Sequence, residues 1–208
     1  MAEEVQVKRG RGGRPAAGQG DVEARLLAAA TRLFLERGYD ATSCDQVALD
    51  ARAGKASIYA RYANKAALFA AVIDSMLART AQDDVTAAQS LDARLAAVGM
   101  RVVEDALHAD ALGLLRLLVA NPAIGMRADH AFWQAGVRRV AQALALRGPG
   151  TVDAAMAPAA QFIELVLAPA LMRALLGEAA TALMAGTPAR IAAAIAVLTA
   201  GGKLDGWT

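Results

Sequence analysis

The chain has 208 residues, of which 56% are hydrophobic but only 4% aromatic, and its formal net charge is +2. Alanine, the strongest helix former, dominates this composition, and hairpin signals between alternating segments are absent, so an all-α fold is predicted. No uncharged apolar run reaches the roughly 18 residues that span a bilayer, and the first residues lack the apolar core of a signal peptide. These features argue against membrane and secreted classes, and a cytoplasmic protein is expected.

Residues 1–20 are rich in glycine, include Pro15 and show no periodicity, which predicts a disordered tail. Basic residues separated by glycines lie within it, among them Arg11 and Arg14. Arginines on a flexible arm can enter the minor groove of DNA, so these two are candidate DNA contacts. The alternative is a solvated tail that makes loose phosphate contacts.

A first helix is predicted from about Val22 to Arg37, with Asp21 as its N-cap and Gly38 as its stop signal. Its inner stripe consists of Leu26, Ala30, Leu33 and Phe34.

Residues 42–69 read as two short helices around a tight break, followed by the start of a third. Ser43 and Gln46 have the spacing of a capping box, and Thr42 with Asp45 offers an alternative register. The chain breaks across residues 52–54 before Lys55 opens the second short helix. This arrangement predicts a helix-turn-helix.

The second short helix places apolar and polar residues on different sides. Ile58 and Tyr62, four residues apart, are expected to anchor it on the first helix. Lys55, Ser57, Tyr59 and Arg61 remain on outward faces, where their donors suit phosphate oxygens and base edges in a major groove. Asn64 can cap a third helix that begins near Lys65.

This stretch resembles the DNA-binding domain of the tetracycline-repressor (TetR) family of transcriptional regulators. The resemblance covers roughly residues 22–69 and includes LFLERGYDATS, the pair Val47 and Ala48, and KASIYARYANKAALF. It implies operator contacts from the second short helix, phosphate contacts around it, and an apolar set that holds the module together. The candidate DNA-binding residues are Thr42, Lys55, Ala56, Ser57, Tyr59, Arg61, Lys65, Arg11 and Arg14.

The chain departs from the family pattern in the turn, where the family usually has A-G-V-S and this sequence has Ala51, Arg52, Ala53 and Gly54. A position that favours a left-handed backbone therefore carries Arg52, and the residue that would cap the second helix has no side chain. Glycine is a tolerable N-cap, so the fold is expected to survive with a slightly altered turn. Ala66 replaces a frequent glutamate near a helix start.

A long apolar helix is predicted over residues 65–81, joining the two parts of the chain and transmitting movement between them. Further helices are predicted at 91–108, 111–120, 129–147, 152–176 and 188–200, with breaks at Asn121-Pro122, 148–150 and Gly186. The stretch ALGLLRLLVANPAIGMRADHAFWQAGVRRV also resembles the C-terminal regulatory domain of the AefR-like branch of TetR regulators.

Two late helices, 161–176 and 190–200, carry apolar residues on nearly every face, which predicts burial against a second subunit. The last two long helices of TetR-like proteins serve that purpose. The candidate dimer-interface residues are Phe162, Val166, Ile191, Ile195 and Leu198. Candidate ligand-binding residues in an adaptable apolar cavity are Met100, Met126, Trp133 and Phe162; the alternative is that such residues are ordinary core.

An enzyme is disfavoured because no metal-ligand spacing surrounds the histidines and no phosphate-binding glycine loop follows a strand. Neither a cofactor nor a metal is expected. Cys44, the only cysteine, is read as a small buried residue rather than a redox sensor.

The sequence therefore predicts a homodimeric, ligand-responsive transcriptional regulator, a repressor released from a palindromic DNA operator by a small apolar or amphipathic effector. Its divisions are a basic tail (1–20), an N-terminal three-helix DNA-binding domain (21–69) and a C-terminal helical regulatory and dimerisation domain (70–208). The alternative is a helical architectural protein that binds DNA without sequence preference.

Overall fold

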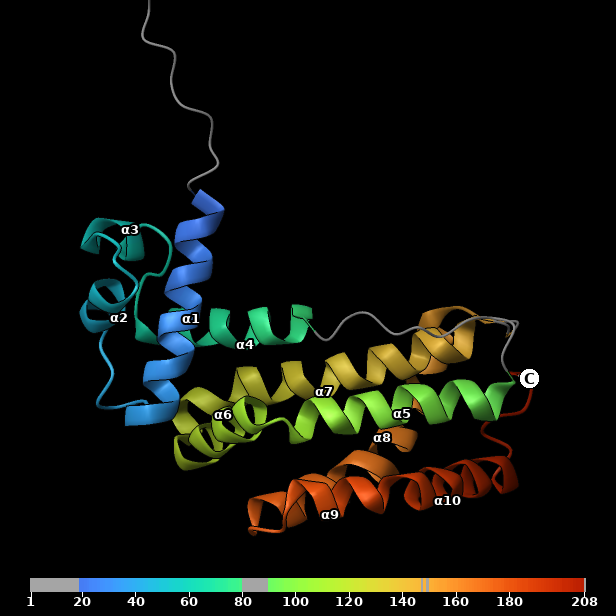
Figure 1. Cartoon of the computed structure of the whole chain (residues 1–208). Coiled ribbons are helices and arrows are strands. Elements are labelled where there is room, and N and C mark those ends of the chain that lie inside the picture. The colour runs from blue at the N-terminus through green and yellow to red at the C-terminus, as the bar shows by residue number, and fades with distance from the viewer. Residues whose placement is uncertain (1–18, 80–89, 147, 149, 208) are drawn as a thin grey trace, which may run out of the picture.

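The computed structural model describes residues 19–79, 90–146, 148 and 150–207. These described residues form ten α-helices and no strand, which confirms the predicted all-α class. Figure 1 shows an elongated molecule with α1 to α3 at one end and the C-terminus at the other. The helices are α1 (Gln19–Arg37), α2 (Cys44–Asp50), α3 (Lys55–Tyr59), α4 (Lys65–Arg79), α5 (Leu91–Leu107), α6 (Ala109–Ala120), α7 (Pro122–Ala145), α8 (Val152–Leu175), α9 (Ala180–Ala185) and α10 (Thr187–Ala200).

The first helix begins three residues earlier than predicted, at Gln19, and ends as predicted at Arg37. Gly38 follows it with a φ of 82° and donates its N–H to the Phe34 carbonyl at 2.9 Å. A residue with a side chain would be strained at this φ, which explains the glycine stop. The inner stripe of the helix is buried, as predicted: Leu26, Ala30, Leu33 and Phe34.

An N-terminal core forms where α1 to α4 converge. The rings of Phe34 and Phe69 meet edge to face, with centroids 4.9 Å apart. The core extends along α4 to Met76 and is closed from the other side by Leu114 and Leu118 of α6. Two helices, α4 and α6, therefore join the N-terminal helices to the rest of the molecule.

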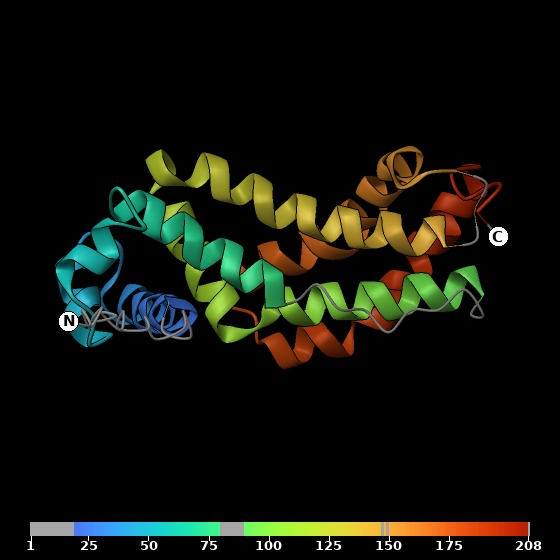
Figure 2. The same ribbon diagram turned by 90° about the horizontal axis from the view of Figure 1, so that it is seen from above.

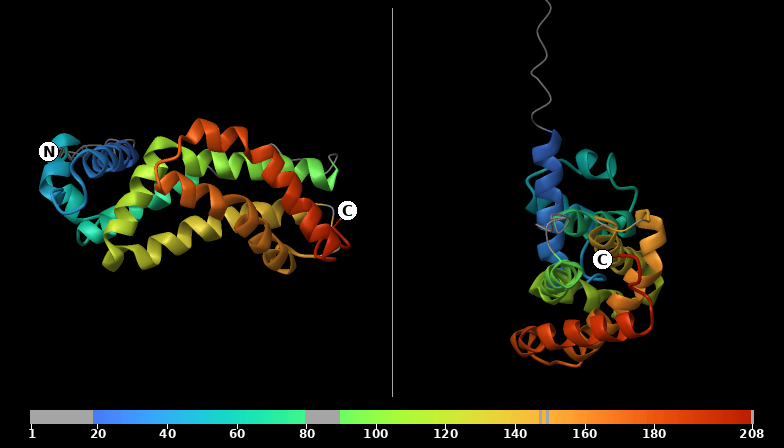
Figure 3. Two further views of the ribbon diagram at one scale, coloured as in Figure 1. Left: turned by 90° about the horizontal axis from the view of Figure 1, so that it is seen from below. Right: turned by 90° about the vertical axis from the view of Figure 1, so that its right-hand side faces the viewer.

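A larger C-terminal core lies between α5, α7, α8 and α10. Val137, Val140 and Leu144 of α7 are buried in it. Seen from above, α4 lies over α5 to α7 and ends above them (Figure 2). Seen from below, α8 and α10 lie on the face opposite α4 (Figure 3).

Several other helix boundaries differ from prediction. The helix predicted over 129–147 begins earlier, at Pro122. Proline suits the first position of a helix, so Asn121-Pro122 ends one helix and begins the next. The helix predicted at 111 begins at Ala109, and α9 was not predicted because its six residues are too few to show a period. The helix predicted over 65–81 is described to Arg79.

A buried arginine ties the C-terminal end to this core. Arg94 of α5 is 1% exposed, and its guanidinium donates to the carbonyls of Ala143 and Trp207 at 3.0 and 3.2 Å. The ring of Trp207 packs against Gly148 and Gly150, where no side chain intervenes. The last described residues are thus part of the folded core.

Candidate functional site

The turn between α2 and α3 has the geometry that its sequence predicts. The Ser43 hydroxyl accepts the N–H of Gln46 at 3.2 Å, and Gln46 accepts the N–H of Ser43 at 3.0 Å, which confirms the capping box. Arg52 has a φ of 52°, the left-handed conformation that favours glycine. Gly54 precedes α3 with no side-chain cap, so both departures from the family pattern lie where the turn is built.

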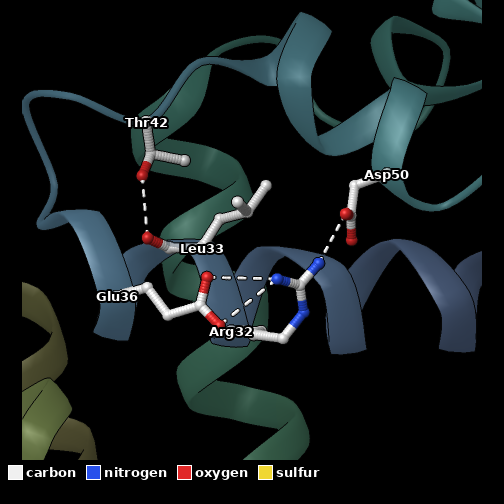
Figure 4. A network of polar contacts seen from close by, with 5 residues as sticks. All are labelled: Arg32, Leu33, Glu36, Thr42 and Asp50. Atoms are coloured by element: carbon white, nitrogen blue, oxygen red, sulfur yellow. Dashed lines mark hydrogen bonds and ion pairs between the residues drawn. The ribbon is translucent and has the colours of Figure 1, made fainter.

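Contacts with α1 hold this turn in position (Figure 4). The guanidinium of Arg32 pairs with Asp50 of α2 at 2.5 Å and with Glu36 of its own helix at 3.1 Å. Arg25 donates to the carbonyl of Ala51, the C-cap of α2, at 3.2 Å. Charge-assisted bonds of this kind fix the orientation of α2 on α1.

The short helix α3 has a buried side and an exposed side. Ile58 is fully buried and Tyr62 is 6% exposed, so these two residues anchor α3 in the N-terminal core as predicted. Tyr59 is 52% exposed. The outer side of α3 carries three exposed residues and one that is half-buried: Lys55, Ala56 and Tyr59, and Ser57.

Asp45 of α2 holds two of the polar side chains of this outer surface, those of Lys55 and Tyr59. Its carboxylate accepts from Lys55 Nζ at 2.5 Å and from the Tyr59 hydroxyl at 3.2 Å. The hydrogen bond from Lys55 lowers the pKa of the Asp45 carboxyl, and the same bond raises the pKa of Lys55. The negative charge of Asp45 raises the pKa of Tyr59. Asp45 therefore holds two of the donors that α3 presents, a role that the sequence analysis missed.

Two of the predicted phosphate contacts also bind their own chain. Arg61 donates to the Ser57 carbonyl at 2.9 Å. Lys65 donates to the carbonyls of Tyr39 and Asp40 at 2.7 and 3.2 Å, and its Nζ lies 4.3 Å from the centre of the Tyr39 ring. Both side chains are half-buried. Arg11 and Arg14 lie outside the described residues.

Thr42 is placed differently from its predicted role as a DNA contact. Its residue is 2% exposed, and its hydroxyl donates to the carbonyls of Leu33 and Gly38 at 3.1 and 2.8 Å (Figure 4 shows the Leu33 bond). A side chain whose donor is used and whose surface is covered cannot reach a phosphate. Thr42 instead satisfies carbonyls at the C-terminal end of α1.

A second candidate site is an apolar cavity of about 80 Å³ between α4, α5, α6, α7 and α8. Met76 and Leu77 of α4 form part of its wall, so the helix that leaves the N-terminal core also encloses the cavity. Its other described lining residues are Val102, Asp105, Ala106, Ala111, Leu115, Phe132, Trp133, Ala135, Gly136, Arg139, Leu167 and Leu171.

Of the predicted ligand-binding residues, the structure brings only Trp133 to this cavity. Phe162 is 1% exposed and packs beside Gly99 and Ile191 in the C-terminal core. Met100 lies in an open surface hollow of about 620 Å³ between α5 and α10. The side chain of Met126 lies outside the described residues.

The cavity contains an ion pair that the sequence analysis missed. Arg139 Nη1 lies 2.7 Å from Asp105 Oδ2, and the two side chains are 9% and 20% exposed. Arg139 follows Trp133 by six residues and Gly136 by three, so all three share one side of α7. The spacing of these residues on α7 could be read from the sequence. The pairing of Arg139 with Asp105 of α5 could not.

Most of the predicted dimer-interface residues point into the chain's own core. Phe162, Val166, Ile191 and Leu198 are each no more than 3% exposed, and only Ile195 is half-buried. Because α8 and α10 are apolar on nearly every face, the pattern did not tell the inner face from the outer. The large exposed apolar residues on and just after these helices are Leu165, Met172, Leu176 and Val197.

Small residues complete the exposed faces of α8 and α10. On α10 they include Ala189, Ala192, Ala193 and Ala196, which flank Val197. By length and mean hydropathy, α8 is the one described helix that could cross a membrane, but 39% of its most apolar stretch is buried within the chain. A core helix of a folded bundle has these properties.

In the described part of the chain, no three His, Cys, Asp or Glu side chains gather to hold a metal ion. Cys44 is buried between helices, as predicted, and burial raises the pKa of its thiol. A protonated, buried thiol is a poor nucleophile and a poor redox sensor.

Comparison with known proteins gives this geometry a family context. Residues 26–72 match the family model described as bacterial regulatory proteins, tetR family. A DNA-binding transcriptional repressor, TetR, of Mycobacteroides abscessus is 46% identical over 52 residues, which are 25% of this chain and 27% of that protein. The similarity to these curated relatives thus spans about a quarter of their length.

Solved structures resemble the chain over most of its length. The flavonoid-responsive regulator FrrA is 26% identical and has a TM-score of 0.61, covering 87% of this chain and 97% of that one. The SmeT–triclosan complex is 17% identical with a TM-score of 0.58, covering 85% of this chain and 90% of that one. The shared fold therefore includes the C-terminal helices.

Proposed function

We propose that this chain is a regulator of the tetR family, whose model matches residues 26–72, and that it is a homodimeric repressor released from a palindromic operator by a small apolar or amphipathic effector. Regulators of this family are DNA-binding transcriptional repressors, often responsive to ligands, and are not enzymes. We place DNA binding in residues 21–69, regulation and dimerisation in residues 70–208, and the protein in the cytoplasm.

The observation that carries the proposal is the exposed side of α3. Lys55 and Tyr59 project donors from a helix whose opposite side, through Ile58, is fully buried. An α-helix fits the major groove, where lysine and hydroxyl donors can reach base edges and phosphates. Because α2 is fixed on α1 by Arg32 and Asp50, α3 enters the groove at a defined angle.

Binding to two half-sites requires two copies of α3 at a fixed spacing. The exposed apolar faces of α8 and α10 supply a surface for a two-fold contact, because a monomer would leave Leu165, Met172 and Val197 in water. These faces lie far from α3, at the opposite side of the bundle from α4 (Figures 1 and 3). A partner docked there leaves both copies of α3 free.

The effector proposal rests on the cavity and on α4. Pockets for small ligands usually measure about 300–1,000 Å³, so a cavity of about 80 Å³ must widen to admit one. Met76 and Leu77 belong to its wall, and widening moves them. Since α4 also carries Phe69 of the N-terminal core, an effector that favours the wider cavity favours a different position of the DNA-binding helices.

The relatives support an aromatic effector. One structural neighbour is described as flavonoid-responsive and another was solved in complex with triclosan. In this chain, Phe132 and Trp133 line the cavity from α7. Aromatic side chains bury large area and stack on rings.

The experiment is a footprint of the DNA upstream of the protein's own gene, followed by binding to the protected fragment. Lys55→Ala and Tyr59→Ala should each weaken operator binding by about 1–3 kcal/mol while leaving circular dichroism unchanged. Lys203→Ala is the matched control, because Lys203 is an exposed lysine between α10 and the C-terminus, and the C-terminus lies at the end of the molecule opposite α3. Unchanged footprints in the α3 variants, or protection without sequence preference, would overturn the proposal.

A further inference from the structure

The effector cavity is apolar except at one place. Among its described lining residues, only Asp105 and Arg139 are charged, and they are paired with each other at 2.7 Å. An ion pair inside an apolar wall restricts which ligands can bind, since each charge must keep a partner when water leaves.

Asp105 retains the capacity to accept another hydrogen bond. Its Oδ2 accepts from Arg139, whereas the cation nearest to its Oδ1 is Arg101 Nη2 at 4.0 Å, beyond hydrogen-bond distance. Arg101 donates instead to Glu104 at 2.9 Å. A carboxylate offers about four acceptor sites, so a donor can bind Asp105 without displacing Arg139.

Asp105 also lies where the cavity meets the surface. A polar hollow of about 330 Å³ lies beside the cavity, and both share Asp105, Met76 and Ala111 in their walls. The hollow is lined further by Glu104, His108 and Asp110. A ligand in the cavity would therefore present one edge to Asp105 and the remainder to apolar side chains.

Three ligand chemistries can be compared at this position. A carboxylate would lie beside the like charge of Asp105 and would compete with it for Arg139. An ammonium group could approach Asp105 but would lie beside Arg139. An uncharged hydroxyl can donate to Asp105 and leaves the pair intact. Breaking a buried ion pair costs more than a single new hydrogen bond returns, so the hydroxyl is favoured.

We propose that the effector of this regulator is an uncharged aromatic molecule whose hydroxyl group donates to the Asp105 carboxylate, with its ring beside Phe132 and Trp133. This inference rests on the proposed function, because it takes the cavity as the effector site. Asp105 is then the residue that sets ligand class, and Arg139 is the residue that holds the Asp105 carboxylate in place.

The test uses three probes that share one apolar body: para-butylphenol, its methyl ether and para-butylbenzoate. Their affinities for the full chain are measured by titration calorimetry without DNA. The phenol should bind at least about tenfold more tightly than the ether, a difference of about 1.4 kcal/mol. The benzoate should bind at least about a hundredfold more weakly than the phenol. Equal affinities for phenol and ether would overturn the proposal, and a benzoate that binds most tightly would make Arg139 the anchor instead.

Variants test whether the Asp105–Arg139 pair causes the preference for the phenol over the ether. In Asp105→Leu/Arg139→Met apolar side chains replace the pair as a unit and the carboxylate acceptor is gone, so the phenol should lose its advantage while the ether binds within about threefold of its wild-type affinity. Arg101→Gln is the control and should keep the full preference, because Arg101 is not hydrogen-bonded to Asp105. A preference that survives the double variant contradicts the assignment. If that variant does not fold, the three-probe comparison on the wild-type chain decides alone.

The design separates this inference from the function on which it rests. Calorimetry without DNA measures only which class of ligand the protein prefers. Release of an operator fragment by each probe measures whether that ligand regulates DNA binding. If the protein prefers the phenol but the phenol does not release the operator, the proposed ligand class stands and the proposed effector response is overturned. Operator release by phenol and ether alike would retain the regulator and overturn the role of Asp105.

Discussion

Residues 19–79 and residues 90–207 are both helical, but they hold their functional residues in place by different means. In the first region, polar contacts between residues close in sequence set the geometry, such as the capping box of Ser43 and the bond from Arg25 to Ala51, 26 residues apart. In the second, the longest-range contact joins Arg94 to Trp207 across 113 residues, and apolar packing does the rest.

The difference shows how each region can change shape. A module braced by short-range polar contacts behaves as a rigid body and presents α3 at one angle. A bundle of alanine-rich helices around a small cavity can widen when a ligand enters, because its contacts are non-directional. Linking the two through α4 couples a deformable region to a rigid one.

Trp207→Ala should cause the largest loss in the free energy of unfolding. Trp207 is 9% exposed, lies against Gly148 and Gly150, and accepts from Arg94. Truncating a buried tryptophan costs about 3–5 kcal/mol, which urea unfolding can measure. Trp133→Ala is the control, since Trp133 borders a cavity and is half-exposed, and it should cost clearly less. A loss below about 1 kcal/mol for Trp207→Ala would show that the C-terminal end is not part of the core.

Val197→Glu should separate the subunits without unfolding them. Val197 is 59% exposed on α10, so a charge there is tolerated in the monomer but is buried at the proposed two-fold contact. Sedimentation should report a monomer, and operator affinity should fall by at least about a hundredfold, or 2.7 kcal/mol, because two half-sites are no longer bound as one unit.

The neighbouring residue is the matched control for this prediction. Leu198 is 3% exposed, so Leu198→Glu should unfold the chain instead of separating folded subunits. A Val197→Glu variant that sediments as a dimer would place the interface elsewhere.

This pair of residues also shows where sequence analysis reaches its limit. The N-terminal helices, the capping box and the left-handed Arg52 could be predicted, because caps and turns depend on residues within a few positions. The faces of α8 and α10 could not be, since Ile191 and Val197 are equally apolar and only distant packing decides which is covered. Asp45 and Asp105 were missed for the same reason, as each acquires its role from a partner on another helix.

Arg52→Gly tests whether the rigid module stores strain in its turn. Arg52 has a φ of 52°, and a left-handed backbone costs a residue with a side chain about 1–2 kcal/mol. Glycine recovers most of this but loses more entropy on folding, so the free energy of unfolding should rise by about 0.5–1 kcal/mol. Arg52→Ala keeps the Cβ atom and should give no gain. If alanine stabilises as much as glycine, the guanidinium and not the backbone is responsible.

Asp45→Asn should change DNA binding by the smallest amount and in a diagnostic way. Asp45 holds Lys55 and Tyr59 together on the outer side of α3. Removing its charge frees both side chains for any phosphate, so affinity for unrelated DNA should rise about threefold to tenfold. Operator affinity should gain less, since the two side chains are no longer oriented, and the ratio of operator to unrelated affinity should fall.

The control and the pH dependence distinguish orientation from charge. Asp50→Asn makes the same charge change on α2, but Asp50 pairs with Arg32 of α1 and not with α3. It should leave the affinity ratio unchanged, and equal shifts in both variants would mean that only net charge matters. Because Lys55 lowers the pKa of Asp45, the contact is present above the ordinary aspartate range and is lost only as pH falls through the lowered value. The effect of Asp45→Asn should therefore be the same from about pH 6 to pH 8; a change within that range would contradict a charged Asp45 held by Lys55.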